Sequence, residues 1–231
     1  MIALLAAGAA LHVAAIATPL PAAAAVVPGA VVARYEAVVA ALKEPRTFTV
    51  EFTLEQTGTR TLEQTHRIFR VGGDERDETI EVNGTRAISP SVRIFRGRPY
   101  RYAVARLAPR SAQYVFEYVG PHKNGRHVDY VFRLLPKLPA ARFRFTQVAI
   151  DGLTFLPSAV EFASSPAVSG GVTFAKSDRY WVATGANASA QLGGGMAHER
   201  LTFSNWRFPK TLPKSTFAVA RPLPTLPPTP G

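Results

Sequence analysis

Apolar and polar residues alternate along most of the chain between residues 47 and 208. The clearest example is FTVEFTL at residues 48–54. Because successive side chains of a strand point to opposite faces, this pattern predicts a strand with one apolar and one solvated face. The same reasoning predicts further strands at 61–71, 79–82, 113–119, 127–134, 142–150, 153–162, 172–181 and 199–208.

Short turn sequences separate these predicted strands. Asn83-Gly84 is a strong signal for a tight hairpin, because both residues tolerate positive φ. Gly72-Gly73, Asp151-Gly152 and residues 120–125 predict further turns, whereas residues 163–200 have a looser pattern. Since most connections read as hairpins, we expect an antiparallel sheet rather than parallel βαβ units.

One helix is predicted before the first strand. Its apolar positions follow a period near 3.6, and Pro28-Gly29 precedes them while Pro45 ends the helix. These positions are Val31, Val32, Tyr35, Val38, Val39 and Leu42. The pattern as a whole predicts a mainly β protein with one or few helices, in the α+β class, and a sandwich- or barrel-like antiparallel sheet.

The two ends of the chain differ from the middle. Residues 1–27 contain no Asp, Glu, Lys or Arg, and an apolar core followed by small residues is the layout of a secretory signal peptide. We therefore expect residues 1–25 to be cleaved and the protein to lie in the periplasm or outside the cell; a retained membrane anchor is the alternative. Residues 221–231 are rich in proline and are expected to be a disordered tail.

The chain carries a formal net charge of +11 and contains no cysteine. An exported protein without disulfides fits a bacterial envelope protein. Its export argues against a nucleic-acid partner. The scattered arginines between residues 67 and 110 have two interpretations, which are solvated strand faces or a basic patch that faces a membrane or a membrane protein.

No constellation of residues predicts catalysis, a cofactor or a metal site. There is no Gly-x-Ser-x-Gly nucleophile elbow, and no spacing typical of zinc ligands. The carboxylates at residues 74–78 are interpreted as a loop. His127 and Asp129 fall on one strand face, where a solvated ion pair is favoured over a metal pair. We therefore expect a binding protein rather than an enzyme.

Aromatic residues are the most prominent feature of the predicted strands, with 14 Phe, 7 Tyr and 2 Trp. They are interpreted either as an ordinary packed core or as the lining of an apolar concavity that holds a ligand. The candidate ligand-binding residues on the second interpretation are Phe52, Leu54, Tyr102, Tyr114, Phe116, Tyr118, Tyr130, Phe132 and Phe145.

Three segments resemble the LolA superfamily of periplasmic lipoprotein carriers. The predicted helix leads directly into FTVEF at residues 48–52, DGLTFLP occupies residues 151–157, and ERLTFSNWRF at 199–208 is followed by Leu212-Pro213 and Phe217. The resemblance spans roughly residues 30–220. The chain departs from LolA in the middle, where residues 89–109 read as strand or loop instead of lid helices.

This resemblance implies a strongly curved, half-open antiparallel β-barrel of about 8–11 strands with the N-terminal helix on its concave side. It implies a carrier that holds lipid or lipoprotein acyl chains in an apolar cavity. We expect the protein to be a monomer. The superfamily also includes the N-terminal domain of the stress sensor RseB, so a regulatory module that contacts a membrane partner is the alternative function.

Overall fold

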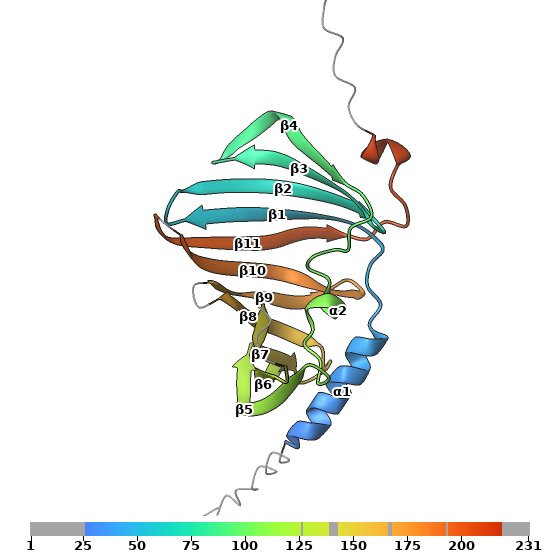
Figure 1. Ribbon diagram of the computed structural model, residues 1–231. Helices are drawn as coiled ribbons and strands as arrows, with labels where there is room; N and C mark the ends of the chain where they lie inside the picture. Colours follow the sequence, from blue (N-terminus) through green and yellow to red (C-terminus); the bar gives the residue numbers. More distant parts are fainter. Residues whose placement is uncertain (1–25, 126, 139–142, 166–167, 193, 219–231) are drawn as a thin grey trace, which may run out of the picture.

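The computed structural model describes residues 26–218 apart from residues 126, 139–142, 166–167 and 193. Within this part, all strands belong to one antiparallel sheet of eleven, in the order β4-β3-β2-β1-β11-β10-β9-β8-β7-β6-β5 (Figure 1). The strands are β1 Thr47–Thr57, β2 Leu62–Val71, β3 Asp74–Val82, β4 Thr85–Phe95, β5 Tyr114–Asn124, β6 His127–Pro136, β7 Arg144–Asp151, β8 Pro157–Ser165, β9 Val168–Ser177, β10 Tyr180–Leu192 and β11 Gly195–Arg207.

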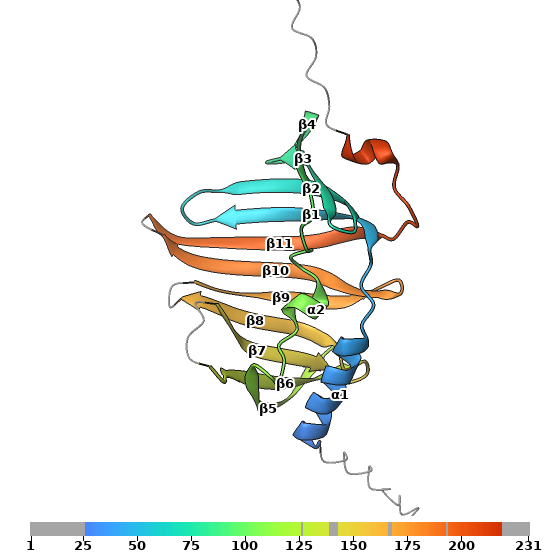
Figure 2. The same cartoon turned by 45° about the vertical axis from the view of Figure 1, so that its right-hand side comes forward.

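The sheet is strongly curved, and its topology explains how one connection comes to cover its concave side. Neighbouring strands follow one another in sequence everywhere except where β1 pairs with β11. As a result β4 and β5 are consecutive in the chain but form opposite edges of the sheet. Residues 96–113, here named the crossing segment, must therefore span its full width (Figures 1 and 2). The short helix α2, Val104–Leu107, lies within this segment.

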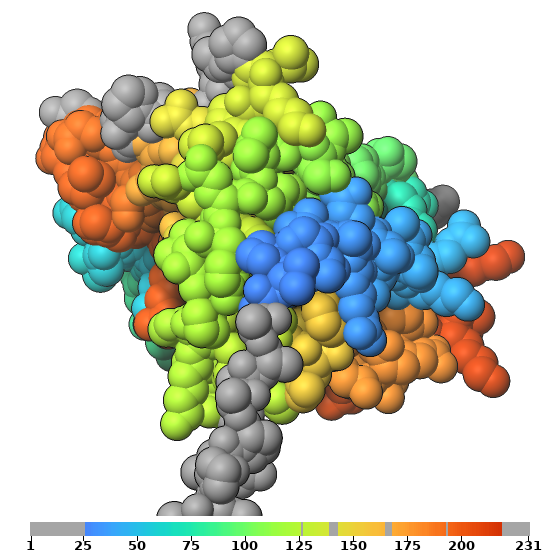
Figure 3. Space-filling model, turned by 90° about the horizontal axis from the view of Figure 1, so that it is seen from below, coloured from blue at the N-terminus to red at the C-terminus, as the bar shows by residue number. Residues whose placement is uncertain are grey.

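Helix α1, Pro28–Ala41, packs against the β5 side of the concave face. Its buried face consists of Val31, Tyr35 and Val39, as the helical period predicts. The ring of Tyr35 lies 6.0 Å from that of Phe116 on β5, measured between centroids. Figure 3 shows α1 in blue beside the green residues of the crossing segment and β5. No helix in the described part is long and apolar enough to cross a membrane.

The hydrophobic core lies on the concave face. Side chains from β1, β2 and β6–β9 alternate into it, and α1 and the crossing segment cover them. The most deeply buried large side chains of the sheet are Phe48, Val50, Phe132, Val148, Ile150 and Val160. The predicted α+β class and the curved, half-open antiparallel sheet with an N-terminal helix are thus confirmed. The leader and the proline-rich tail predicted for residues 1–25 and 221–231 lie outside the described residues.

Several boundaries differ from the sequence prediction. Strand β5 continues through residues 120–124, where a turn was expected. The prediction of one strand at 172–181 is wrong, because a turn with Asp178 at φ 53° separates β9 from β10. Most of the described residues between 163 and 200 therefore belong to strands β8–β11 instead of a looser region. The strand expected from residue 153 begins only at Pro157. The preceding residues form a turn in which Asp151 Oδ1 accepts hydrogen bonds from the backbone N–H of Leu153 and Thr154, at 3.1 and 2.7 Å.

The two acidic features of the sequence are also placed differently from expectation. The carboxylates at 74–78 belong to strand β3, where Glu75 and Asp77 point to the concave face. Asp129 is not part of a solvated ion pair, since it is only 3% exposed. Its Oδ2 accepts hydrogen bonds from Ser158 Oγ at 2.7 Å and from Asn124 Nδ2 at 2.9 Å. This carboxylate joins β5, β6 and β8.

Candidate functional site

The crossing segment meets the sheet through two tyrosines. The Tyr100 ring packs edge-on against Phe48 of β1, with centroids 5.0 Å apart, and the Tyr102 ring packs edge-on against Phe203 of β11 at 4.9 Å. The two tyrosine rings are themselves 5.9 Å apart. They form one wall of a space that the β1–β4 half of the sheet leaves open, away from α1.

This space is a cavity of about 320 Å³, bounded by β1–β4, β11 and residues 100–102. Its lining divides into two kinds of side chain. The apolar and aromatic lining consists of Phe52, Leu54, Ile68, Phe95, Tyr100, Tyr102, Leu201 and Phe203. The polar and charged lining consists of Gln64, His66, Glu75, Asp77, Arg93, Arg101 and Glu199. The cavity is therefore amphipathic.

His66 lies where the two kinds of lining meet. Its imidazole stacks on the Phe52 ring, with centroids 4.7 Å apart and planes 3° from parallel. Its Nδ1 lies 2.7 Å from Asp77 Oδ1, and its Nε2 lies 3.4 Å from Gln64 Oε1. The imidazole is almost completely buried. These contacts fix the ring as part of the wall, because both nitrogens already face an oxygen.

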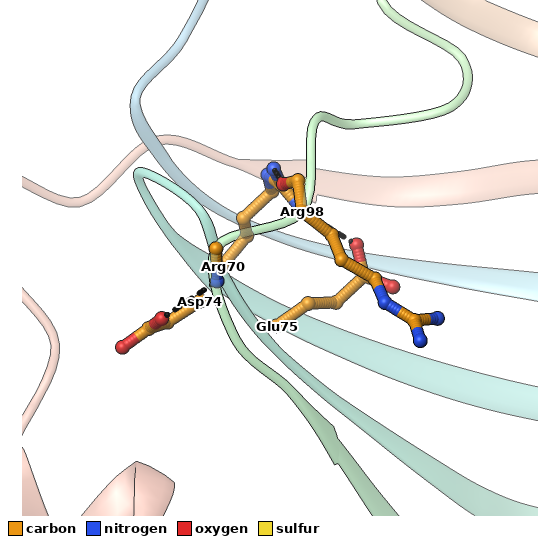
Figure 4. Close-up of polar contacts among 5 residues, drawn as sticks. Arg70, Asp74, Glu75 and Arg98 are labelled. Carbon is orange, nitrogen blue, oxygen red and sulfur yellow. Dashed lines mark hydrogen bonds and ion pairs between the residues drawn. The ribbon is translucent and has the colours of Figure 1, made fainter.

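A second buried pair anchors the start of the crossing segment (Figure 4). Arg70 is 4% exposed, and its Nη1 donates a hydrogen bond to Glu75 Oε2 at 2.8 Å. Its Nη2 donates to the backbone carbonyl of Arg98. The Arg98 N–H in turn donates to the carbonyl of Gly73 at 2.9 Å. One guanidinium thus joins β2, β3 and the crossing segment.

The far end of the crossing segment is anchored on α1. Tyr35 donates a hydrogen bond from its hydroxyl to the carbonyl of Pro109 at 2.9 Å. Glu36 accepts one from the N–H of Ser111 at 2.5 Å. Beyond the end of the helix, Glu44 accepts one from the N–H of Ala105 at 2.8 Å. Because both ends are held, the segment has a defined path over the sheet.

Burial keeps the tyrosines of this region uncharged. Desolvation raises the pKa of Tyr100 well above its ordinary value, and it also raises the pKa of Tyr102. The Tyr100 hydroxyl is buried and has no hydrogen-bond partner among the described residues. The tyrosines of the lining are therefore neutral, and its charge is carried by other side chains, among them Glu75, Arg93 and Arg101.

The nine ligand-binding candidates from the sequence occupy different places. Phe52, Leu54 and Tyr102 line the cavity. The others lie on β5–β7 and belong to the core or pack against it, under α1 and the second half of the crossing segment. These six are Tyr114, Phe116, Tyr118, Tyr130, Phe132 and Phe145. Among them Tyr114 accepts a hydrogen bond from the Phe145 N–H at 3.1 Å, and Phe132 is completely buried.

Sequence reasoning missed the charged side chains of the cavity lining, although the sequence contains a signal for them. The Gly72-Gly73 turn sets β2 against β3, so that Arg70 lies opposite Glu75 and Ile68 opposite Asp77. A basic residue and an acidic residue equally far from a two-glycine turn predict a cross-strand pair. No group of three or more His, Asp or Glu side chains in the described part could hold a metal ion.

Comparison with known proteins gives matches only at the level of structure. No family model and no curated protein match the sequence. The solved structures matched include a LolA superfamily protein from Nitrosomonas europaea, at 13% identity, with 84% of this chain and 99% of that chain covered and a TM-score of 0.44.

Two further matches have the same TM-score of 0.44. One is a putative outer membrane lipoprotein-sorting protein domain from Vibrio parahaemolyticus, at 17% identity, with 80% of this chain and 95% of that chain covered. The other is a DUF1329 family protein from Desulfovibrio piger, at 12% identity, with 80% and 96% covered. One of these three matched structures is thus of a LolA superfamily protein, the superfamily that segments of the sequence resemble.

Proposed function

We propose that this protein is an extracytoplasmic binder or carrier of a lipid-like amphiphile, which it holds in the concave cavity. The proposal rests on the composition of the cavity lining, which combines apolar and aromatic side chains with charged ones. An alkyl chain would lie against Phe52, Leu54 and Leu201. The polar end of the ligand would face Arg93 and Arg101 near the edge of the sheet.

The size of the cavity restricts the ligand. About 320 Å³ lies at the lower end of the range of roughly 300–1,000 Å³ for small-molecule pockets. This volume suits one alkyl chain better than the several chains of a lipoprotein. A bulkier ligand would require the crossing segment to move away from the sheet, which means separating Tyr102 from Phe203.

The bonding of the cavity carboxylates supports binding rather than catalysis. Glu75 is paired with Arg70, Asp77 with His66, and Glu199 accepts a hydrogen bond from Gln56 at 3.0 Å. A carboxylate–histidine pair can act as a catalytic base when the free imidazole nitrogen faces a nucleophile. Here that nitrogen faces an amide, and the cavity lining includes no Ser, Thr or Cys.

The proposal is tested by the uptake of a fluorescent single-chain fatty acid. Leu54→Trp puts a larger side chain into the cavity, whereas Thr53→Trp puts the same side chain on the opposite face of the same strand. We expect wild type and Thr53→Trp to bind the probe with similar affinity, and Leu54→Trp to bind it at least tenfold more weakly. Equal binding by the two variants, or no uptake by wild type, would contradict the proposal.

A further inference from the structure

A second hollow of about 670 Å³, here named the basic cleft, lies at the margin of the sheet where α1 gives way to β1. Three segments that are distant in the sequence form it: the α1–β1 loop, the β9–β10 turn and the end of β11. Its lining residues are Lys43, Glu44, Arg46, Thr47, Arg179, Tyr180, Phe208, Pro209 and Lys210. In Figure 3 the light-blue residues after α1 and the orange to red residues reach the same margin.

The charges of the basic cleft are unbalanced. Four of its side chains are cationic, namely Lys43, Arg46, Arg179 and Lys210, and none of them forms an ion pair within the described part of the chain. Its carboxylate, Glu44, already accepts the hydrogen bond from Ala105. Cations gathered around one hollow repel each other, and a bound anion relieves this repulsion.

Aromatic rings adjoin these cations. The rings of Tyr180 and Phe208 lie 4.7 Å apart, and the Arg179 guanidinium lies 5.1 Å from the Tyr180 ring centroid. Phe208 also stacks on Trp206 at 5.9 Å, which joins the cleft to the core. Aromatic rings next to Lys and Arg are typical of surfaces that meet the head-group region of a bilayer.

We propose that the basic cleft docks the protein on a bilayer of anionic phospholipids. The four cations match an anionic surface in charge. The half-buried rings favour a lipid surface over a soluble acidic polypeptide, because such rings lie at the depth of the lipid head groups in a bilayer. Each Lys or Arg near an anionic bilayer contributes about a factor of five to binding. Four such residues together contribute several hundredfold. The inference does not depend on the occupant of the concave cavity.

Vesicle sedimentation tests the docking surface. The vesicles contain phosphatidylcholine alone or mixed with phosphatidylglycerol. The first variant replaces Lys43, Arg46, Arg179 and Lys210 with Gln. The control replaces four exposed cations elsewhere, Arg86, Lys123, Lys137 and Arg144, with Gln, so that its net charge is the same. All eight side chains are exposed, and circular dichroism checks that both variants are folded.

We expect wild type to bind the anionic vesicles and not the neutral ones, with binding lost in 0.5 M salt. The cleft variant should bind at least a hundredfold more weakly, and the control at most about tenfold. Equal loss in both variants would overturn the proposal, because it would show that net charge alone is responsible. Wild-type binding to polyglutamate but not to anionic vesicles would also overturn it. Leu54→Trp should bind vesicles like wild type, which separates this test from that of the cavity.

Discussion

The imidazole of His66 lies flat on the ring of Phe52, with centroids 4.7 Å apart, where apolar and polar side chains of the cavity lining meet. Both residues are on the concave face, on neighbouring strands, in direct register. Asp77 on the third strand holds the other edge of the imidazole. The wall is therefore built across three strands, and its stability depends on a polar group that is almost completely buried.

Replacement of Asp77 tests this buried contact. We expect Asp77→Asn to lower the free energy of unfolding by about 1–3 kcal/mol, because a buried charge-assisted hydrogen bond is weakened. Asp74→Asn is the matched control, since Asp74 pairs with Arg96 on the surface. A surface pair contributes about 0–1 kcal/mol. Urea denaturation measures both values, and equal losses would show that the His66–Asp77 contact contributes no more than a surface pair.

Replacement of Arg70 tests the anchor of the crossing segment. Arg70→Met leaves Glu75 buried without its partner and removes the bond to the Arg98 carbonyl. We expect the free energy of unfolding to fall by about 3–5 kcal/mol. Amide hydrogen exchange in residues 98–104 should become faster. Arg133→Met removes an exposed pair with Glu117 and should cost at most about 1 kcal/mol. Unchanged exchange in the crossing segment of Arg70→Met would contradict its role as an anchor.

Local patterns predicted an element well where it has one apolar and one polar face. The strand at residues 48–54 and the helix at 31–42 have such faces, and both are present. The first half of strand β3 was missed because its concave face carries charge, at Glu75 and Asp77, so that these residues show no alternation. The β9–β10 turn was missed because Asp178 adopts its positive φ without a glycine to mark the place.

Alkaline pH provides a test of the buried tyrosines. Burial raises the pKa of Tyr35, Tyr100 and Tyr102 above the ordinary value near 10. Their contribution to stability is complete below pH 10, where the phenols are neutral in both states. It is lost as the pH rises further, because the unfolded chain ionises first.

The free energy of unfolding should therefore fall above pH 10, by up to about 1.4 kcal/mol per pH unit for each buried phenol. The free energy of unfolding of Tyr35→Phe should fall less steeply with pH than that of wild type. At neutral pH it should be lower by about 1 kcal/mol, because the hydrogen bond to Pro109 is lost. Denaturation curves at pH 8–12 measure both slopes. A slope unchanged by Tyr35→Phe would show that this phenol is not responsible.

Tyr102 should limit the size of the ligand. Tyr102→Ala removes the ring that packs on Phe203 and enlarges the cavity. We expect the preference among fatty acids of 8 to 16 carbons to move to longer chains, measured as the dissociation constant of each. Tyr118→Ala is the control, because Tyr118 packs against Phe132 on the other half of the sheet. An equal change in both variants would indicate that all the candidate aromatics act on one common cavity.

The candidate site was predictable only in part, for a topological reason. Apolar and aromatic positions indicated Phe52, Leu54 and Tyr102, but the same kind of position marks core residues such as Phe132 and Phe145. Cavity residues and core residues differ in what covers them. The path of the crossing segment decides which part of the concave face is covered. That path follows from the pairing of β1 with β11, about 150 residues apart in the chain, and no local pattern contains it.

Photolabelling with a diazirine-bearing fatty acid reports where an alkyl chain lies in the protein, and therefore whether the concave cavity is the binding site. The protein is irradiated with the probe, digested and sequenced by mass spectrometry, with and without excess unlabelled fatty acid. We expect labels on β1, β11 and residues 100–102, at side chains such as Leu54, Tyr102 and Leu201, and we expect the competitor to abolish them. Labels confined to the convex face or to the β5–β7 half of the sheet would contradict it.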